Sequence, residues 1–407
     1  MLATLIPLFD ENMSVKAYSL FSQKHNYFLS PTLSPTGLFD GAGRINGLEV
    51  IDNMGIETIS VDKEIFVPVN NISLFADIKH QCSAPPKRLV LLIDNTVLPQ
   101  EMYITRMKEL KMQGFRFAMR KLPVSSFEDY RHVLLLCDYI FLNHQKIDIT
   151  KAQIYFSKIY PDIRLIAGNI KTQEDFEKLC STGGYAFYEG DFYRTPVTKG
   201  DTDVSPLKIN YIELLNIVNE ENFDLTQAAD VIGRDTALVI SLLNIVNRMT
   251  IASEVTSIRH ATAILGQREL KKWTSTAVTK QLCLDKPNEI TRLSLLRAKF
   301  AENLATAFEL GTKGQELFLM GLFSVLDLIL NKPMEEALDM VIVSNDIRSA
   351  LTGHNGPLSV VYDFMLQYEN ANWQEVSRIL LIHNIDIDII YQAYCDSLKW
   401  YRRLFIE

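Results

Sequence analysis

The distribution of apolar residues changes near residue 200, and this change limits the available folds more than any other feature of the sequence. Up to about residue 197, short β-rich apolar runs alternate with amphipathic stretches, which predicts strand–helix units and a parallel sheet. Besides a first strand expected near 14–20, six runs are clear, at 64–70, 88–94, 115–119, 139–142, 164–167 and 185–188. This number of strands approaches a β/α barrel.

Helical periodicity replaces the β-rich runs after a polar segment that contains Pro and Gly. Leu238, Leu242 and Val246 lie at the spacing of one helical face. A length of 407 residues also favours two domains over one. We therefore predict a multidomain chain, with an α/β TIM-like (β/α) barrel at 1–197, a linker at 198–206 and an all-α helical domain at 207–407.

Charge, cysteine content and hydropathy exclude several classes of protein. Residues 1–200 hold equal numbers of acidic and basic side chains, so the formal charge of −8 falls on the helical half, which disfavours a nucleic-acid partner. Five cysteines without a CxxC pair indicate reduced thiols. The most apolar stretch, residues 317–330, is too short to cross a bilayer and contains Asp327, so it predicts a buried helix. Without a signal peptide, a cytoplasmic protein with no membrane partner is expected.

Two segments near the end of the first half carry recognisable motifs: LIAGNIKTQEDF at 165–176 and YAFYEGDFYRTP at 185–196. With the order of the strands over roughly residues 1–197, they resemble the EAL domain. This β/α barrel hydrolyses cyclic di-GMP with two divalent cations in its active members. The first motif is similar to the family's IAEKVET…F, and the second, from Glu189 onward, is similar to QGYFFSKP.

The resemblance places the family's metal-binding positions on residues that lack metal-binding chemistry. A two-cation site needs carboxylates at several strand ends. The departures are Ser19 and Gln23 for the signature Glu and Arg, Leu92 for the third-strand Glu, Arg120 and Lys121 for paired acids, Phe141 and Asn143 for Lys-x-Asp, Gly168, Asn169 and Lys171 in the first motif, and Glu189 in the second. Asn70 aligns with a metal-binding Asn, and Asp94 points to the same side as Leu92 by strand alternation. Two oxygen donors do not make a two-metal centre, so neither a metal nor another cofactor is expected.

The adjacent cations Arg120 and Lys121 fall at the expected mouth of the barrel, which is the usual ligand face of this fold. They are candidates for binding an anionic ligand. The competing interpretation is a solvated or acid-paired surface charge, which is favoured because cyclic di-GMP recognition in the resembled family also uses the Arg that Gln23 replaces.

The second half carries a different set of motifs. Asp235, Leu242, Leu243 and Asn247 form one pattern, Ser257, Ile258, Leu265 and Gly266 form a second, and Trp273 follows. They resemble the HDOD domain, a relative of HD-type metal phosphohydrolases, over roughly residues 203–400. An HD site needs a His-Asp pair with further ligands. None of His260, His354 and His383 is followed by Asp, so the His-Asp pair is missing. The nine motif residues named above are therefore predicted to be structural.

Together the two resemblances indicate the EAL-HDOD family of bacterial signal-transduction proteins. Because both metal-ligand sets are missing, we predict no enzyme but a catalytically inactive regulatory adaptor that contacts signalling proteins. The alternative is a receptor that binds cyclic di-GMP or a related nucleotide without cleaving it. An enzyme that uses residues outside both motifs is the last alternative. EAL barrels pair through their helices, so the resemblance also implies a homodimer.

Overall fold

The computed structural model describes residues 1–29, 44–198, 204–220, 222–249 and 255–404. The chain divides into two compact units. The first comprises residues 1–195, 306–309 and 364–407, and the second comprises residues 196–305 and 310–363. The predicted boundaries at 197 and 207 stay a prediction, and the contacts add that residues 364–407 group with the N-terminal unit.

A closed barrel forms the centre of the first unit, with its strands hydrogen-bonded in the order of the sequence. Within the described residues the strands are β1 (Leu2–Phe9), β2 (Val15–Gln23), β3 (Glu64–Pro68), β4 (Leu89–Ile93), β5 (Arg116–Met119), β6 (Tyr139–Asn143), β7 (Arg164–Ile170) and β8 (Tyr185–Gly190). β1 runs antiparallel to β2 and β8, and the other neighbours are parallel. The predicted barrel is confirmed, and each strand expected from the sequence is present. The expectation missed β1.

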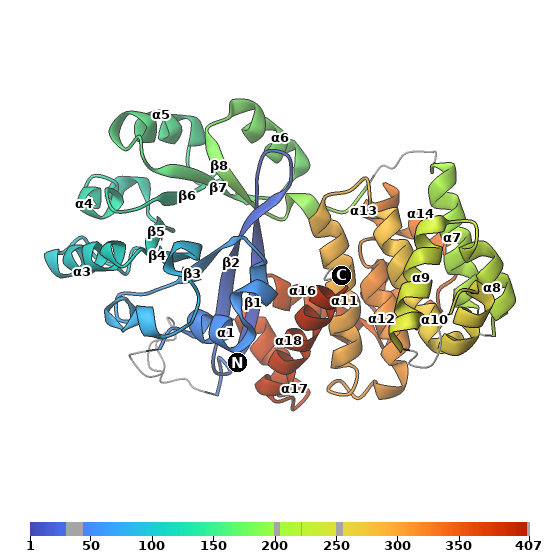
Figure 1. Ribbon diagram of the computed structural model, residues 1–407. Helices are drawn as coiled ribbons and strands as arrows, with labels where there is room; N and C mark the ends of the chain where they lie inside the picture. The colour runs from blue at the N-terminus through green and yellow to red at the C-terminus, as the bar shows by residue number, and fades with distance from the viewer. Residues whose placement is uncertain (30–43, 199–203, 221, 250–254, 405–407) are drawn as a thin grey trace. The chain divides into compact units, whose positions relative to one another are not determined.

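Helices cover the outside of the barrel in Figure 1. Those that alternate with the strands are α1 (Asn46–Met54), α2 (Ile56–Ser60), α3 (Glu101–Met112), α4 (Arg131–Leu134), α5 (Ile149–Ile159) and α6 (Gln173–Thr182). The last two have side-chain caps: Asp148 accepts a hydrogen bond from the Lys151 N–H, and Thr172 from the Asp175 N–H. These caps satisfy backbone donors that each first turn leaves without a partner.

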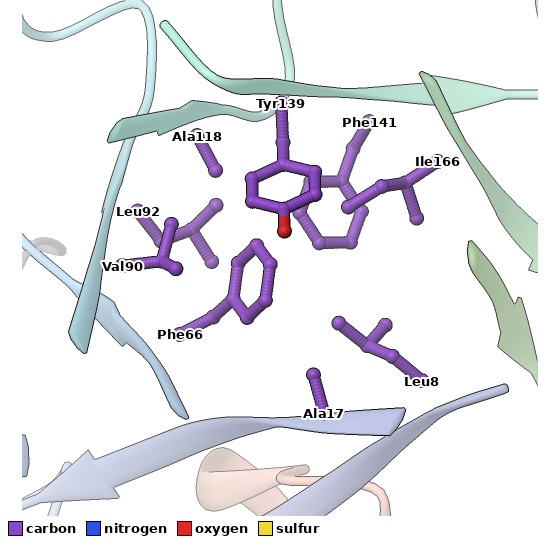
Figure 2. Packing of buried hydrophobic residues seen from close by; sticks show 9 residues of the cluster. All are labelled: Leu8, Ala17, Phe66, Val90, Leu92, Ala118, Tyr139, Phe141 and Ile166. Atoms are coloured by element: carbon purple, nitrogen blue, oxygen red, sulfur yellow. The ribbon is translucent and has the colours of Figure 1, made fainter. Parts of the chain in front are cut away.

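Apolar side chains fill the interior of the barrel. Figure 2 shows nine of them pointing inward from successive strands: Leu8, Ala17, Phe66, Val90, Leu92, Ala118, Tyr139, Phe141 and Ile166. The Phe66 ring lies 5.2 Å from that of Tyr139 and 5.8 Å from that of Phe141, measured between centroids. Alternate side chains of each strand point into the barrel, and most of them are apolar. Polar side chains therefore gather mainly at the ends of the strands.

The second unit is helical. Its helices within the described residues are α7 (Pro206–Asn219), α8 (Leu225–Ile232), α9 (Thr236–Met249), α10 (Ile258–Leu282), α11 (Asn288–Leu304), α12 (Gly314–Phe323), α13 (Leu326–Leu330), α14 (Met334–Asp339) and α15 (Asn345–Gly353). The apolar stretch at 317–330 is buried as expected, but it is divided between α12 and α13. No helix among the described residues is both long and apolar enough to cross a membrane.

Three more helices follow: α16 (Ser359–Glu369), α17 (Trp373–Ile382) and α18 (Ile387–Arg403). From residue 364 onward they belong to the unit that contains the barrel. The helical texture of the sequence was predicted correctly over this region. Periodicity shows that a helix has an apolar face, but not which core receives that face.

Gly266 interrupts α10 with φ 71° and ψ 170°, a conformation that is nearly restricted to glycine. We expect Gly266→Ala to lower the free energy of unfolding of the helical unit by about 1–3 kcal/mol, because the added Cβ strains the backbone even though no atom lies within 4 Å of it. Trp273 in the same helix reports unfolding by fluorescence. Arg268→Ala, at an exposed position of this helix, is the control and should change the stability by less than about 0.5 kcal/mol.

Candidate functional site

The C-terminal ends of β2 to β8 form the rim of the barrel, where polar side chains replace the apolar interior. An ion pair crosses this rim. Arg120, directly after β5, donates to both carboxylate oxygens of Glu189 on β8, with N–O distances of 2.7 and 3.2 Å. The Glu189 side chain is only 7% exposed and that of Arg120 is 25% exposed. A bidentate contact of this kind fixes both the charge and the orientation of the guanidinium.

Two aromatic rings flank the same guanidinium. Its central carbon lies 4.9 Å from the centroid of Phe141 and 5.3 Å from that of Phe21. Arg120 is therefore held in place by a carboxylate and by two apolar surfaces that favour a cation. Lys121, its exposed neighbour, has a φ of 58°. The structure places Arg120 at the rim, and the prediction that Arg120 and Lys121 bind an anion stays a prediction.

Several positions singled out by the EAL resemblance lie inside the barrel below this pair. Leu92 and Phe141 belong to the interior cluster of Figure 2. Ser19 is fully buried, and its hydroxyl has no hydrogen-bond partner among the described residues. These three side chains contribute packing to the barrel rather than charge to the rim.

Amide side chains occupy the part of the rim formed by β6 and β7. Asn169 Nδ2 donates to the Gln145 side-chain oxygen at 3.1 Å, and it lies 3.5 Å from the Asn143 side-chain oxygen. Asn169 has a φ of 64°, which turns the chain immediately after Gly168. The result is a group of side-chain amides at the ends of β6 and β7, the two strands between β5 and β8.

A second charged group lies beyond the amides. Asp191 pairs with Lys171 at 2.6 Å and with Arg194 at 2.7 Å. Burial disfavours the charged form of Asp191, but the two neighbouring cations outweigh that effect and hold the pKa of Asp191 below its usual value. Lys171, at the family's last carboxylate position, therefore completes an ion-pair network.

The remaining oxygen donors near the rim are occupied by the turns that follow their strands. The Asn70 side chain accepts from the backbone N–H groups of Ile72 and Ser73, and the Asp94 carboxylate accepts from the N–H and hydroxyl of Thr96. The described part of the chain contains no cluster of three or more His, Cys, Asp or Glu side chains suited to a metal ion. With Glu189 neutralised by Arg120, these residues do not fit a pair of divalent cations.

The polar motif residues of the helical unit cap helices or hold a loop by hydrogen bonds, and the apolar ones are buried or partly buried. Asp235 accepts from the Leu238 N–H at 2.9 Å and from the Tyr211 hydroxyl at 2.6 Å. Asn247 exchanges two hydrogen bonds with the backbone of Val255. Ser257 caps α10. The other members lie as follows: Leu242 is fully buried, and Leu243, Ile258, Leu265 and Trp273 are partly buried.

The HDOD domain family matches residues 205–350. The chain combines a closed eight-stranded barrel with an HDOD domain. This confirms the resemblance to the EAL-HDOD family drawn from the sequence.

Two relatives share much of the length of the chain. A protein named cyclic di-GMP phosphodiesterase CdgJ, from Vibrio cholerae, is 26% identical over 321 residues, which cover 78% of this chain and 74% of the relative. YuxH, from Bacillus subtilis, is 26% identical over 366 residues, which cover 86% of this chain and 87% of the relative.

Solved structures similar to the chain include the MucR phosphodiesterase in complex with cyclic di-GMP. It has a TM-score of 0.38 and 16% identity and covers 47% of this chain and 94% of its own. BlrP1 from Klebsiella pneumoniae with manganese and cyclic di-GMP has a TM-score of 0.38 and 11% identity, and covers 46% of this chain and 54% of its own.

The name of the Vibrio relative contradicts the predicted function. The chain was expected to be catalytically inactive, either as an adaptor or as a non-hydrolysing receptor. However, a relative that aligns with 78% of its length, at 26% identity, is named as a phosphodiesterase. The prediction went wrong because it treated the loss of both metal-ligand sets as the loss of all activity. Such a loss excludes only a reaction that runs through those ligands.

Phe21, Gln145 and Asp191 are rim residues that the sequence interpretation missed. Phe21 could have been found, because it lies two residues after Ser19 on β2 and strand alternation places both on the same side. The pairing of Arg120 with Glu189 had no such signal, since 69 residues separate the two partners.

Proposed function

We propose that this protein acts in cyclic di-GMP signalling and that the rim around Arg120 is where it meets a cyclic dinucleotide. The observation that carries the proposal is the guanidinium of Arg120 between the rings of Phe21 and Phe141. A guanidinium held in one orientation suits phosphate oxygens. The phosphodiesterase named among the relatives supports this choice of nucleotide.

The group of side-chain amides strengthens the proposal. Asn143, Gln145 and Asn169 present side-chain amides at the ends of β6 and β7, which lie between β5 and β8 in the barrel. Side-chain amides read the edges of purine bases through paired hydrogen bonds. The rim thus offers separate groups for the phosphates and for the bases of one ligand.

Binding at the rim has to compete with Glu189, which already holds the guanidinium. We therefore expect Glu189→Gln to tighten binding of cyclic di-GMP, and Arg120→Gln to weaken it by about 10–100-fold, the worth of hydrogen bonds to a charged group. Isothermal titration calorimetry in the presence of Mg²⁺ or Mn²⁺ measures both changes. Chromatography of the same samples detects the linear dinucleotide, the product that the activity named for the relative predicts.

Arg116→Gln is the matched control. Arg116 lies on the same strand as Arg120 but at the opposite end of the barrel, where it pairs with Glu64 at 2.7 Å. If this variant weakened binding as much as Arg120→Gln, the effect would come from the fold and the rim would not be the site. An absence of saturable binding to the unaltered protein would also contradict the proposal.

Two further predictions remain open. Pairing of two copies is expected from the resemblance alone, and light scattering that shows only monomer would remove it. A cytoplasmic location is supported by the five cysteines, all of which are free thiols in the structure.

A further inference from the structure

The closed barrel has little strand pairing along one edge of β1. β1 pairs with β2 from Leu2 to Phe9, but on its other side it pairs with β8 only at Phe9 and Tyr188. Backbone groups on an open edge need partners once they are buried. Pro7 lies on β1, and by strand alternation its nitrogen, which carries no hydrogen, faces the same side of the strand as the N–H of Ala3, which donates to Tyr368.

The C-terminal segment covers this edge. The Ala3 N–H donates to the Tyr368 hydroxyl at 3.2 Å, and Ala3 is 1% exposed. Burial raises the pKa of Tyr368 well above its usual value, so the hydroxyl stays neutral. α18 packs against β1 and α2, and the Cys395 sulfur lies 3.4 Å from that of Met54. Figure 1 shows α16 and α18 beside β1.

The same segment reaches the rim through α17. The Ser377 hydroxyl accepts from the Tyr27 N–H at 3.0 Å, and its backbone oxygen accepts from Asn26 Nδ2 at 3.0 Å. Gln23 Nε2, at the C-terminal end of β2, lies 3.4 Å from the same hydroxyl. Ser377 is fully buried. The loop that follows β2 is therefore fastened to a residue about 350 positions away in the sequence.

A second fastening lies at the end of β8. Arg194 pairs with Glu369 at 3.1 Å and also contacts the Asn370 side chain. Arg194 lies just before the chain leaves the barrel unit, and Glu369 lies just after residue 364, where the chain rejoins it; between them only residues 306–309 group with the barrel unit. The residues matched by the HDOD family, 205–350, lie between these two points in the sequence.

We propose that residues 364–407 act as a strap that covers the β1 edge of the barrel and positions the β2 end of its rim, so that the HDOD domain is an insertion within the barrel domain. Ser377 is the positioning residue of this strap. Phe21 lies two residues before Gln23 on β2 and flanks Arg120, so the strap has a short path to the candidate ligand site. The expected effect of the strap on ligand binding rests on the function proposed above. Its expected effect on the loop that follows β2 does not.

Hydrogen exchange in the full-length chain tests the strap without a ligand. Ser377→Ala removes the acceptor of the Tyr27 N–H, and we expect this amide to exchange about fivefold faster, the effect of losing one ordinary hydrogen bond. Asn26→Ala removes the other contact from the loop side and serves as the second variant. Gln374→Ala, on an exposed position of α17, is the control and should leave exchange of residues 24–29 unchanged.

Titration with cyclic di-GMP then separates the two proposals. If Ser377→Ala and Asn26→Ala both left exchange of the loop unchanged, the strap would be overturned whether or not the nucleotide binds. If exchange rose but the unaltered protein bound no nucleotide, the strap would stand and the proposed function would fail. Faster exchange with an unaltered affinity would overturn the link between the strap and the rim, since we expect at least a severalfold change in affinity.

Discussion

Arg120→Met is expected to lower the free energy of unfolding of the barrel unit by about 3 kcal/mol, because it leaves the carboxylate of Glu189 buried without its partner. We take the lower end of the usual range, since a quarter of the Arg120 side chain is exposed. A Trp273→Phe background leaves Trp373 and Trp400 as the tryptophans of the chain, both in the barrel unit. Their fluorescence in a urea titration measures the change.

A double variant shows whether the loss comes from the stranded charge. Adding Glu189→Gln to Arg120→Met removes that charge, and we expect at least half of the lost stability to return. Lys151→Met, which breaks an exposed pair with Asp148, is the control and should leave the midpoint of the urea titration close to that of the unaltered protein. If the double variant were no more stable than Arg120→Met, the Glu189 charge would not be the cause.

The sequence predicted the parts of the barrel that depend on local pattern. β4 is a run of five buried residues, and such a run bounded by polar residues is typical of a parallel strand. The place of Arg120 directly after a strand also followed from one segment, although the direction of its side chain did not. Each of these inferences needs only the residues of one segment, which is why they held.

Features that depend on contacts between residues far apart in the sequence were not predictable from local pattern. β1 combines Pro7 with an apolar run that lacks alternation, so it gave no strand signal. Ser377 and Gln23 lie 354 residues apart in the sequence, and the amphipathic pattern of α17 does not name its neighbour. The predicted absence of activity was wrong for a different reason, because the loss of two known ligand sets was taken as the loss of all activity.

Gly321→Val is expected to lower the free energy of unfolding of the HDOD domain more than Gly266→Ala does. Gly321 lies in α12 where it crosses α11, and a Cβ added there would lie 2.4 Å from the Arg297 backbone oxygen. No side-chain rotation relieves a clash with backbone, so the helices must separate. We expect the free energy of unfolding to fall by more than about 3 kcal/mol. Trp273 fluorescence in a Trp373→Phe/Trp400→Phe background measures it.

The cost arises from more than the clash. The Ser294 hydroxyl donates to the Leu322 backbone oxygen at 2.6 Å, and Arg297 donates to the Ser324 hydroxyl at 3.1 Å, both between α11 and the end of α12. Separation of the helices breaks these buried bonds as well. Gly314→Ala in the same helix has room, since the nearest atom is 3.8 Å away, and it should be neutral or slightly stabilising. Equal losses in both variants would show that helix approach at Gly321 is not what stabilises the domain.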